Sequence, residues 1–145
     1  QLDNQVWTDI RNMARGEIIT DSKFEAYASD IDPECVEIAK ETAKHAGVYE
    51  NMKIFRQDAL KIKTDGRRGT IVCNPPYGER LLTIKEAEEL YKKMGEHFKT
   101  LDKWQIYIIT NCDNFSKFYG RKADKIRKLY NGMIPCYFYQ FFKNK

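Results

Sequence analysis

Long apolar runs are missing from this sequence. None approaches the roughly 20 residues that a membrane-spanning helix needs, so we expect no membrane association. Histidine is scarce, and its two residues, His45 and His97, argue against a histidine-based metal site, so no metal is expected. Glycine is scarce at the start, where Gly16 is the only glycine before Asp30. No G-x-G cluster therefore occurs in that region.

The four cysteines stand far apart, without the paired spacing of a zinc site or a disulfide framework. They are Cys35, Cys73, Cys112 and Cys136. We interpret them as reduced, buried or half-buried thiols, which predicts a cytoplasmic protein.

Length and composition indicate one folded domain. The chain has 145 residues, of which 42% are hydrophobic and 32% charged. This is enough apolar material for a core. The net charge of +4 is mild for a nucleic-acid-binding protein. The distribution of charge therefore matters more than its total.

The most informative stretch is Asn74-Pro75-Pro76-Tyr77, which follows the apolar, β-branched run 69–73. That run predicts a short buried strand. The two prolines fix their own φ angles, and each keeps the residue before it out of the α region. The loop therefore presents the Asn74 amide, one or two backbone carbonyls and the Tyr77 ring in a rigid arrangement.

These groups suit a planar ring that carries an exocyclic amino group. The Asn74 Oδ1 atom and the Pro75 carbonyl could accept both hydrogens of an –NH2 group, and Tyr77 could stack on the ring. Two acceptors would stabilise the positive charge that grows on the nitrogen during alkylation. The alternative is a proline-stiffened turn with an ordinary core tyrosine.

The remaining chain alternates between strand and helix patterns, which predicts a doubly wound α/β sheet. Apart from 69–73, strands are expected at 24–30, 52–57 and 104–110, and helices at 1–15, 33–46, 85–100 and 111–120. The first helix should be a packing helix with Trp7 in the core or in an interface, and the 85–100 helix should use Tyr91 and His97 for packing. An Asn-Gly pair predicts a closing antiparallel hairpin of 125–130 and 133–142.

An acidic turn follows the strand at 24–30. In Rossmann-like folds, a carboxylate at this position binds ribose hydroxyls. We therefore assign Asp30 to the ribose, Ile31 to the adenine face, and Asp32 to supporting the turn or sharing the ribose. The alternative is that Asp30 and Asp32 only cap the next helix.

Cations gather near the C-terminal hairpin. Residues 117–128 contain six of them against one acid, Asp124. They are Lys117, Arg121, Lys122, Lys125, Arg127 and Lys128. All but Lys117 are our candidates for binding RNA phosphates. An edge strand that lysines protect from pairing explains the same pattern equally well.

The loop at 74–77, placed after an apolar strand, resembles motif IV of the S-adenosylmethionine-dependent amino-methyltransferases. Those enzymes modify adenine, guanine or glutamine nitrogens. A longer succession is similar to the catalytic domain of bacterial large-subunit ribosomal RNA guanine-N2 methyltransferases, often labelled N6-adenine-specific DNA methylases. They carry an N-terminal RNA-binding THUMP domain. The similar blocks are 29–33, 74–81, 89–91, 120–125, 128–132 and 137–141.

The resemblance implies a Rossmann-like class I methyltransferase with a mostly parallel sheet and a C-terminal antiparallel hairpin. Such domains open with a strand and a glycine-rich loop, and both are absent here. In the family's strand order, that first strand lies between the Asp30 and Asn74 strands. We therefore expect part of a catalytic domain, with a leading helix at 1–16 and alternating elements at 24–145.

The resemblance also implies S-adenosylmethionine as cofactor, bound by Asp30, Ile31, Asp32 and Asn74. Asp58 would accept from the adenine amino group, and the backbone N–H of Ala59 would reach the ring. Asn74, Pro75, Pro76 and Tyr77 would act on guanine N2 of large-subunit ribosomal RNA, a partner reached through the THUMP domain and the basic tail. Two alternatives stay open: adenine N6 methylation of DNA or RNA, and a non-catalytic RNA-binding module.

Overall fold

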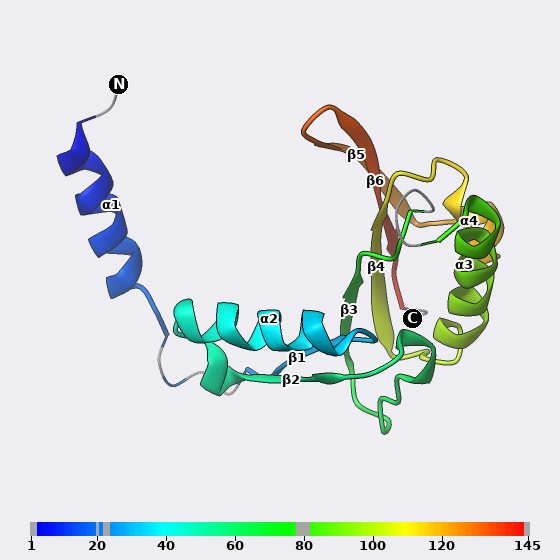
Figure 1. Cartoon of the computed structure of the whole chain (residues 1–145), viewed down its shortest axis with the longest axis horizontal. Helices are drawn as coiled ribbons and strands as arrows, with labels where there is room; N and C mark the ends of the chain where they lie inside the picture. The colour runs from blue at the N-terminus through cyan, green and yellow to red at the C-terminus, as the bar shows by residue number, and fades with distance from the viewer. Residues whose placement is uncertain (1–2, 20, 22–23, 78–81, 144–145) are drawn as a thin grey trace.

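The computed structural model describes residues 3–19, 21, 24–77 and 82–143. Its strands form a two-stranded sheet and a four-stranded sheet, and α-helices connect the parallel strands within each (Figure 1). The α/β class expected from the sequence is confirmed. Within the described ranges, no helix is long and apolar enough to cross a membrane.

The smaller sheet consists of β1 (Ala26–Asp30) and β2 (Met52–Arg56), which pair in parallel. They are joined by α2 (Pro33–His45) and the 3-10 helix η1 (Tyr49–Asn51). α2 begins where the sequence predicts, because Pro33 occupies its first turn and the Asp32 carboxylate accepts the Glu34 N–H at 2.8 Å.

The larger sheet has the strand order β3-β4-β6-β5. β3 (Gly69–Cys73) and β4 (Trp104–Thr110) are parallel, and α3 (Ile84–Phe98) connects them. α4 (Phe115–Tyr119) leads to the antiparallel strands β5 (Lys125–Asn131) and β6 (Ile134–Phe141), and β6 lies between β4 and β5. The predicted hairpin is therefore confirmed.

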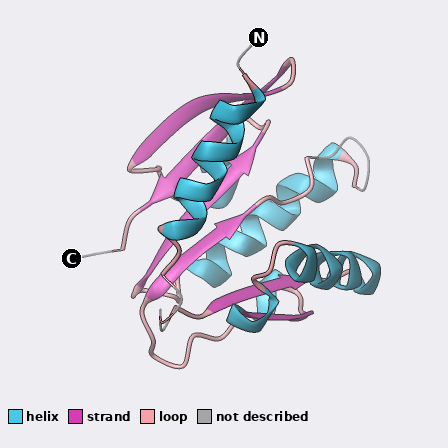
Figure 2. Ribbon diagram, turned by 90° about the vertical axis from the view of Figure 1, so that its left-hand side faces the viewer, coloured by secondary structure: helices cyan, strands magenta, loops and turns pink. Residues whose placement is uncertain are grey.

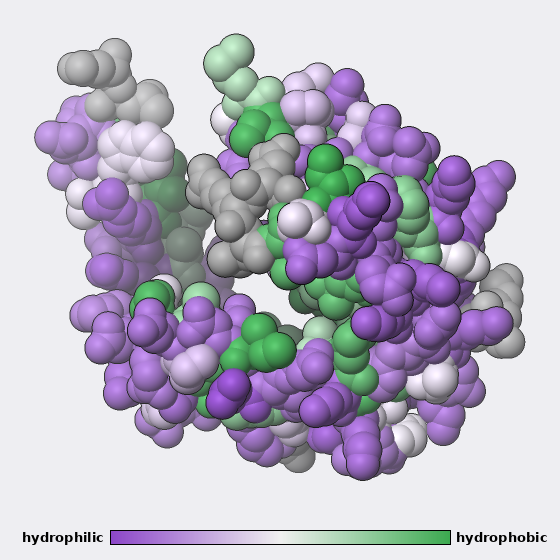
Figure 3. Space-filling view, turned by 45° about the vertical axis from the view of Figure 1, so that its right-hand side comes forward, coloured by the Kyte–Doolittle hydropathy of each residue, from purple (hydrophilic) through white to green (hydrophobic). Residues whose placement is uncertain are grey.

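The two sheets are separate, because among the described residues no ladder joins β1 to β3. The break falls where the sequence analysis expects the absent first strand. Figure 3 shows an opening between the two parts of the molecule. The carboxyl ends of β1, β2 and β3 carry the predicted site residues.

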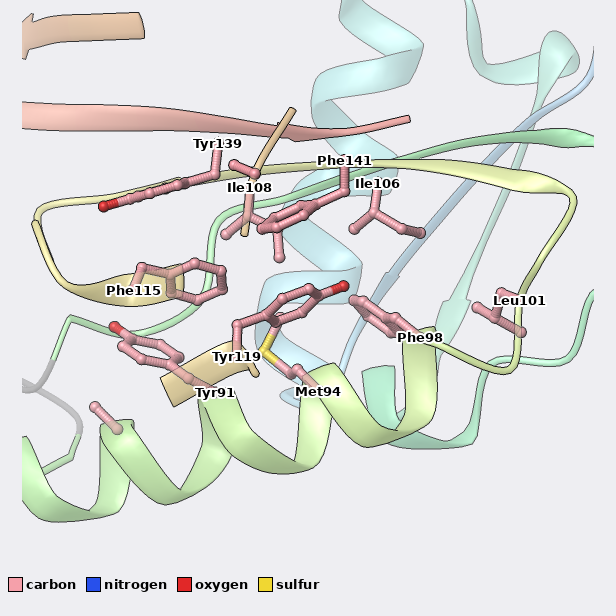
Figure 4. Packing of buried hydrophobic residues seen from close by; sticks show 12 residues of the cluster. Tyr91, Met94, Phe98, Leu101, Ile106, Ile108, Phe115, Tyr119, Tyr139 and Phe141 are labelled. Carbon is pink, nitrogen blue, oxygen red and sulfur yellow. The ribbon is translucent and has the colours of Figure 1, made fainter. Parts of the chain in front are cut away.

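Aromatic rings fill the space between the four-stranded sheet and helices α3 and α4 (Figure 4). Phe115 is fully buried, and its ring centroid lies 4.8 Å from that of Tyr91 and 5.1 Å from those of Tyr119 and Tyr139. This cluster fixes α3 against β4 and β6. The tyrosine hydroxyls need partners inside it, and one of those partners belongs to the predicted site.

Gly95 allows α3 and α4 to approach each other closely. It is buried, and a Cβ atom at this position would overlap the Tyr119 carbonyl oxygen. The absence of a side chain at Gly95 is therefore a packing requirement of the α3–α4 contact.

The first helix, α1 (Asn4–Gly16), forms as the sequence predicts, but none of its residues is buried. Trp7 is 49% exposed, so the prediction that it lies in the core is wrong, whereas its place in an interface stays a prediction. Figures 1 and 2 place α1 on the opposite side of the four-stranded sheet from α3. The amphipathic sequence pattern predicted the helix correctly, but no other part of the described chain buries its apolar face.

Candidate functional site

The Asn74–Tyr77 loop leaves the carboxyl end of β3. Pro75 is buried and Asn74 is exposed, so the loop is anchored in the protein while its amide faces outward. The Tyr77 hydroxyl donates a hydrogen bond to Asn74 Oδ1 at 2.7 Å. Because an amide oxygen has two lone pairs, this bond orients the amide and leaves Oδ1 able to accept a second donor.

A buried hydrogen-bond network fixes the far end of this loop. The Tyr91 hydroxyl donates to the Pro76 carbonyl at 2.8 Å and lies 3.3 Å from Thr110 Oγ1. Thr110 Oγ1 also accepts the Cys112 N–H at 3.2 Å. Tyr91 and Thr110 are both buried. The network therefore links the loop to α3 and to the end of β4.

The two proline carbonyls differ in their hydrogen bonding. The Pro76 carbonyl is turned inward to Tyr91, and no hydrogen bond to the Pro75 carbonyl is seen among the described residues. The Pro75 carbonyl thus stays the candidate acceptor beside Asn74 Oδ1. Sequence reasoning assigned Tyr91 to helix packing alone. The signal it missed is that a buried tyrosine hydroxyl needs a polar partner.

Tyr77 lies at the edge of a pocket of about 210 Å³ that borders α3 and the end of β4. The pocket is lined by Tyr77, Ile84, Glu88, Tyr91, Asn111 and Cys112. A larger groove of about 510 Å³ between α3 and α4 contains no predicted site residue. The smaller pocket is the candidate site of the two, because Tyr77 of the Asn74–Tyr77 loop lines it.

Burial raises the pKa of the Tyr77 hydroxyl, and the nearby Cys136 thiol raises it further. Tyr77 is therefore a neutral hydrogen-bond donor at neutral pH. Cys136 is a buried residue of β6, so this contact also places the start of that strand beside the loop.

Asp30 ends β1 and is exposed. Its Oδ1 atom accepts the Asp32 N–H at 2.9 Å, and Asp32 in turn caps α2. Asp32 thus has the capping role that the alternative interpretation gave to both carboxylates, and Asp30 stabilises the turn before it, while Asp30 Oδ2 forms no hydrogen bond among the described residues. Ile31 is 61% exposed beside them. The Ile31 carbonyl accepts from Arg56 Nε at 2.9 Å, which fixes the turn.

Asp58 and Ala59 follow β2 at the same edge of the smaller sheet. Asp58 caps the 3-10 helix η2 (Ala59–Lys61) and accepts the Leu60 N–H at 2.9 Å. The sequence analysis did not predict η2. Because β1 and β2 are parallel, Asp30 and Asp58 lie at one end of the ladder. Two carboxylates and an exposed Ile31 suit an adenosine, which offers ribose hydroxyls, an amino group and an apolar ring face.

The end of β3 lies within electrostatic reach of Asp30. Burial raises the pKa of the Cys73 thiol to about 11, and the Asp30 charge contributes to this shift. Cys73 immediately precedes Asn74. The charge of the Asp30 turn thus acts on the end of β3, next to the Asn74 loop.

The basic candidates divide into two groups. Arg121 donates to Asp124 Oδ2 at 3.1 Å and to the Phe142 carbonyl at 2.7 Å, so it braces the base of the hairpin. The others are exposed: Lys122, Lys125, Arg127 and Lys128. Arg121 is therefore tied down by structural contacts, whereas the second group faces solvent.

Two further points limit the site. Gly78, Glu79, Arg80 and Leu81, which belong to the resemblance, lie outside the described residues. No cluster of three or more histidine, cysteine or acidic side chains among the described residues could hold a metal ion.

Comparison with known proteins agrees with this geometry. Residues 2–140 match the family UPF0020, described as the RMKL-like methyltransferase domain. The "Putative RNA methyltransferase YpsC" of Bacillus subtilis is 42% identical over 92% of this chain and 36% of its own length. The "Ribosomal RNA large subunit methyltransferase K/L" of Shewanella frigidimarina is 37% identical over 82% of this chain and 17% of its own length.

A solved structure is also similar. The protein SMU.472, described as a methyltransferase and solved in complex with SAH, superposes with a TM-score of 0.88 at 38% identity, over 99% of this chain and 38% of its own. The chain thus spans about a third of this protein and of the Bacillus subtilis relative. At this identity and coverage, the similarity extends to the whole described fold.

Proposed function

The chain belongs to the RMKL-like methyltransferase domain family, and from this premise we propose that it methylates an exocyclic amino nitrogen in RNA with S-adenosylmethionine, at guanine N2 of large-subunit ribosomal RNA. The observation that carries the proposal is the Asn74–Tyr77 loop. Its amide is oriented by Tyr77, and its Pro76 carbonyl is held by the buried Tyr91.

The cofactor half of the site would use the edge of β1 and β2. Asp30 Oδ2 would accept from the ribose hydroxyls, Asp58 from the adenine amino group, and Ile31 would cover the ring. When bound, S-adenosylmethionine supplies an electrophilic methyl group on its sulfonium. Support comes from the two carboxylates and the exposed apolar side chain at this edge. It also comes from the similar protein SMU.472, which was solved in complex with SAH, the molecule that remains after methyl transfer.

The base half would use the loop after β3. A guanine extruded from its stack would place its amino group between Asn74 Oδ1 and the Pro75 carbonyl. These acceptors polarise both N–H bonds and stabilise the charge that develops on N2 during attack. Tyr77 is a neutral donor that keeps the amide in place, and its ring stacks on the base. Positioning by rigid groups then supplies much of the rate.

The names of the relatives favour RNA over DNA as the substrate, and exposed cations favour a nucleic acid of either kind. The curated relatives reported above carry RNA or ribosomal RNA in their names. The exposed cations of the C-terminal hairpin offer phosphate contacts on this chain itself. Adenine N6 remains the competing target, because the same two acceptors would bind its amino group.

The test identifies the product. The protein that the whole gene encodes is incubated with S-adenosylmethionine carrying a labelled methyl group and with large-subunit ribosomal RNA, and the RNA is then digested to nucleosides. We expect labelled N2-methylguanosine, and about a hundredfold slower labelling with Asn74→Ala. Labelled N6-methyladenosine would overturn the guanine assignment. Full activity of Asn74→Ala would overturn the role of the loop.

A further inference from the structure

The β5–β6 hairpin extends past the edge of the sheet that carries the site. Tyr137 of β6 pairs with Thr110, the last residue of β4. Because β6 runs antiparallel, its earlier residues continue beyond that edge, and Ile134 lies roughly 10 Å further out at the usual rise per residue. Figure 1 shows the hairpin rising beyond the end of the sheet where β3 and β4 stop.

The hairpin tip exposes residues that usually prefer a partner. Tyr130 is 66% exposed and Met133 is 96% exposed, with Leu129 and Ile134 also exposed. Gly132 adopts φ 61° and makes the tight turn between the strands. The tip therefore holds an aromatic ring and a flexible thioether above the site edge.

The charge of this segment has one sign. Residues 125–143 contain Lys125, Arg127, Lys128 and Lys143 and no acidic residue. The Lys128 ammonium lies over the Tyr130 ring, 5.6 Å from its centroid. A ring beside a cation matches a nucleotide, because a base has a face that stacks and a phosphate that carries negative charge.

The hairpin is also continuous with the reaction loop. Cys136, near the start of β6, lies close enough to Tyr77 to raise the pKa of its hydroxyl. A polynucleotide whose target base rests on Tyr77 can therefore follow β6 outward to the tip. An acidic protein partner would complement the charge, but it would not explain the position of the tip beside the loop.

We propose that this hairpin binds single-stranded RNA next to the target nucleotide, with Tyr130 and Met133 stacking on a base and with Lys128, on the same face of β5 as Tyr130, contacting a phosphate. This inference rests on the proposed function and adds the recognition of neighbouring nucleotides. The aromatic tip holds the strand while the target base occupies the loop.

The experiment measures the affinity of the chain for a fluorescein-labelled, unstructured RNA oligonucleotide by fluorescence anisotropy. Tyr130→Ala should weaken binding about tenfold, whereas Tyr130→Phe should keep it, because stacking needs the ring and not the hydroxyl. Lys128→Ala should weaken binding less and lower the slope of log affinity against log salt by about one. Circular dichroism verifies that each variant folds.

The chain offers a matched control. Lys44 of α2 lies over the ring of Tyr49 in η1 at 5.1 Å, which repeats the lysine–tyrosine pair in elements other than the hairpin. Tyr49→Ala should leave RNA affinity within twofold of the original. An equal loss with Tyr49→Ala and Tyr130→Ala would overturn the proposal, and so would failure of the unchanged chain to bind the RNA.

One other result would also refute it, and a second would refute only the proposed methylation. If Tyr130→Ala keeps RNA affinity but converts a dimer to a monomer in light scattering, the hairpin edge pairs with a second copy. If RNA affinity falls as expected but the unchanged protein labels no RNA nucleoside, the hairpin binds RNA and the proposed methylation is wrong. The two proposals can therefore fail separately.

Discussion

The two sheets of this chain differ in what holds them together. The four-stranded sheet is covered on one face by α3, α4 and a continuous aromatic core. The two-stranded sheet with α2 buries only Val36 and Ala43 of that helix. Its strand ends are held by local bonds instead, such as those from the Glu34 N–H to the Asp32 carboxylate and from Arg56 to the Ile31 carbonyl.

Each sheet carries one half of the proposed site, and the difference matches the demands of each half. The Asn74 loop must aim one amide and one carbonyl, and its supports reach into the core through Tyr91. Asp30 and Asp58 need only present carboxylates at an open edge. Rigid packing therefore supports the proposed reacting centre, and short hydrogen-bonded turns support the proposed cofactor edge.

Phe115→Ala should have the largest effect on stability of the changes considered. Phe115 is fully buried among tyrosine rings, so removing it should lower the free energy of unfolding by about 3–5 kcal/mol in urea titration. The matched change in the smaller part, Val36→Ala, removes two methyl groups and should cost about 2 kcal/mol. An equal loss for both variants would contradict the contrast between the two parts.

Gly95→Ala should destabilise the chain by about 1–3 kcal/mol, although alanine forms helices better than glycine. The added Cβ would overlap the Tyr119 carbonyl, so α3 and α4 must separate. Thermal melting measures the effect, and Gly16→Ala, where a Cβ meets nothing within 4 Å, is the control. A gain in stability from Gly95→Ala would show that the two helices do not pack as described.

Tyr91→Phe tests the link from the core to the loop. It keeps the ring but removes the hydrogen bond to the Pro76 carbonyl, which should cost about 1 kcal/mol of stability. We also expect slower methyl transfer with unchanged cofactor affinity. Tyr139→Phe is the control, because its hydroxyl donates to the Cys112 and Asp113 carbonyls instead. Equal rates for the two variants would make Tyr91 a packing residue only.

A smaller effect should follow alkaline pH. Burial raises the pKa of Tyr139 from 10.0 to about 12 and that of Cys73 from 9.0 to about 11. The unfolded chain therefore loses these protons first, and the free energy of unfolding should fall as pH rises from about 9 to about 12. Below that window this contribution is fully present. Tyr139→Phe should make the fall shallower in urea titrations across this range, and an unchanged slope would contradict it.

Local sequence patterns predicted most of the helices and strands, because these elements depend on residues that are close in the sequence. The apolar run 69–73 followed by two prolines gave both a strand and the loop after it, and Asp32-Pro33 marked the start of α2. Tertiary contacts decided the rest. Local patterns could show neither the α4 backbone beside Gly95 nor the bonds of Arg121 to Asp124 and the Phe142 carbonyl.

The central claim is that the cofactor binds at the Asp30 edge, whereas the Asn74 loop acts on the methyl acceptor. The most direct test is titration calorimetry with S-adenosylmethionine on the protein that the whole gene encodes, together with a measurement of its methyl-transfer rate. Asp30→Ala should weaken cofactor binding about tenfold to hundredfold, since a charged hydrogen bond is lost. Asp3→Ala, which removes a similar exposed bond to Gln5, is the control. Asn74→Ala should bind the cofactor normally and lose the rate. Weak binding by Asn74→Ala, or a full rate, would contradict the account.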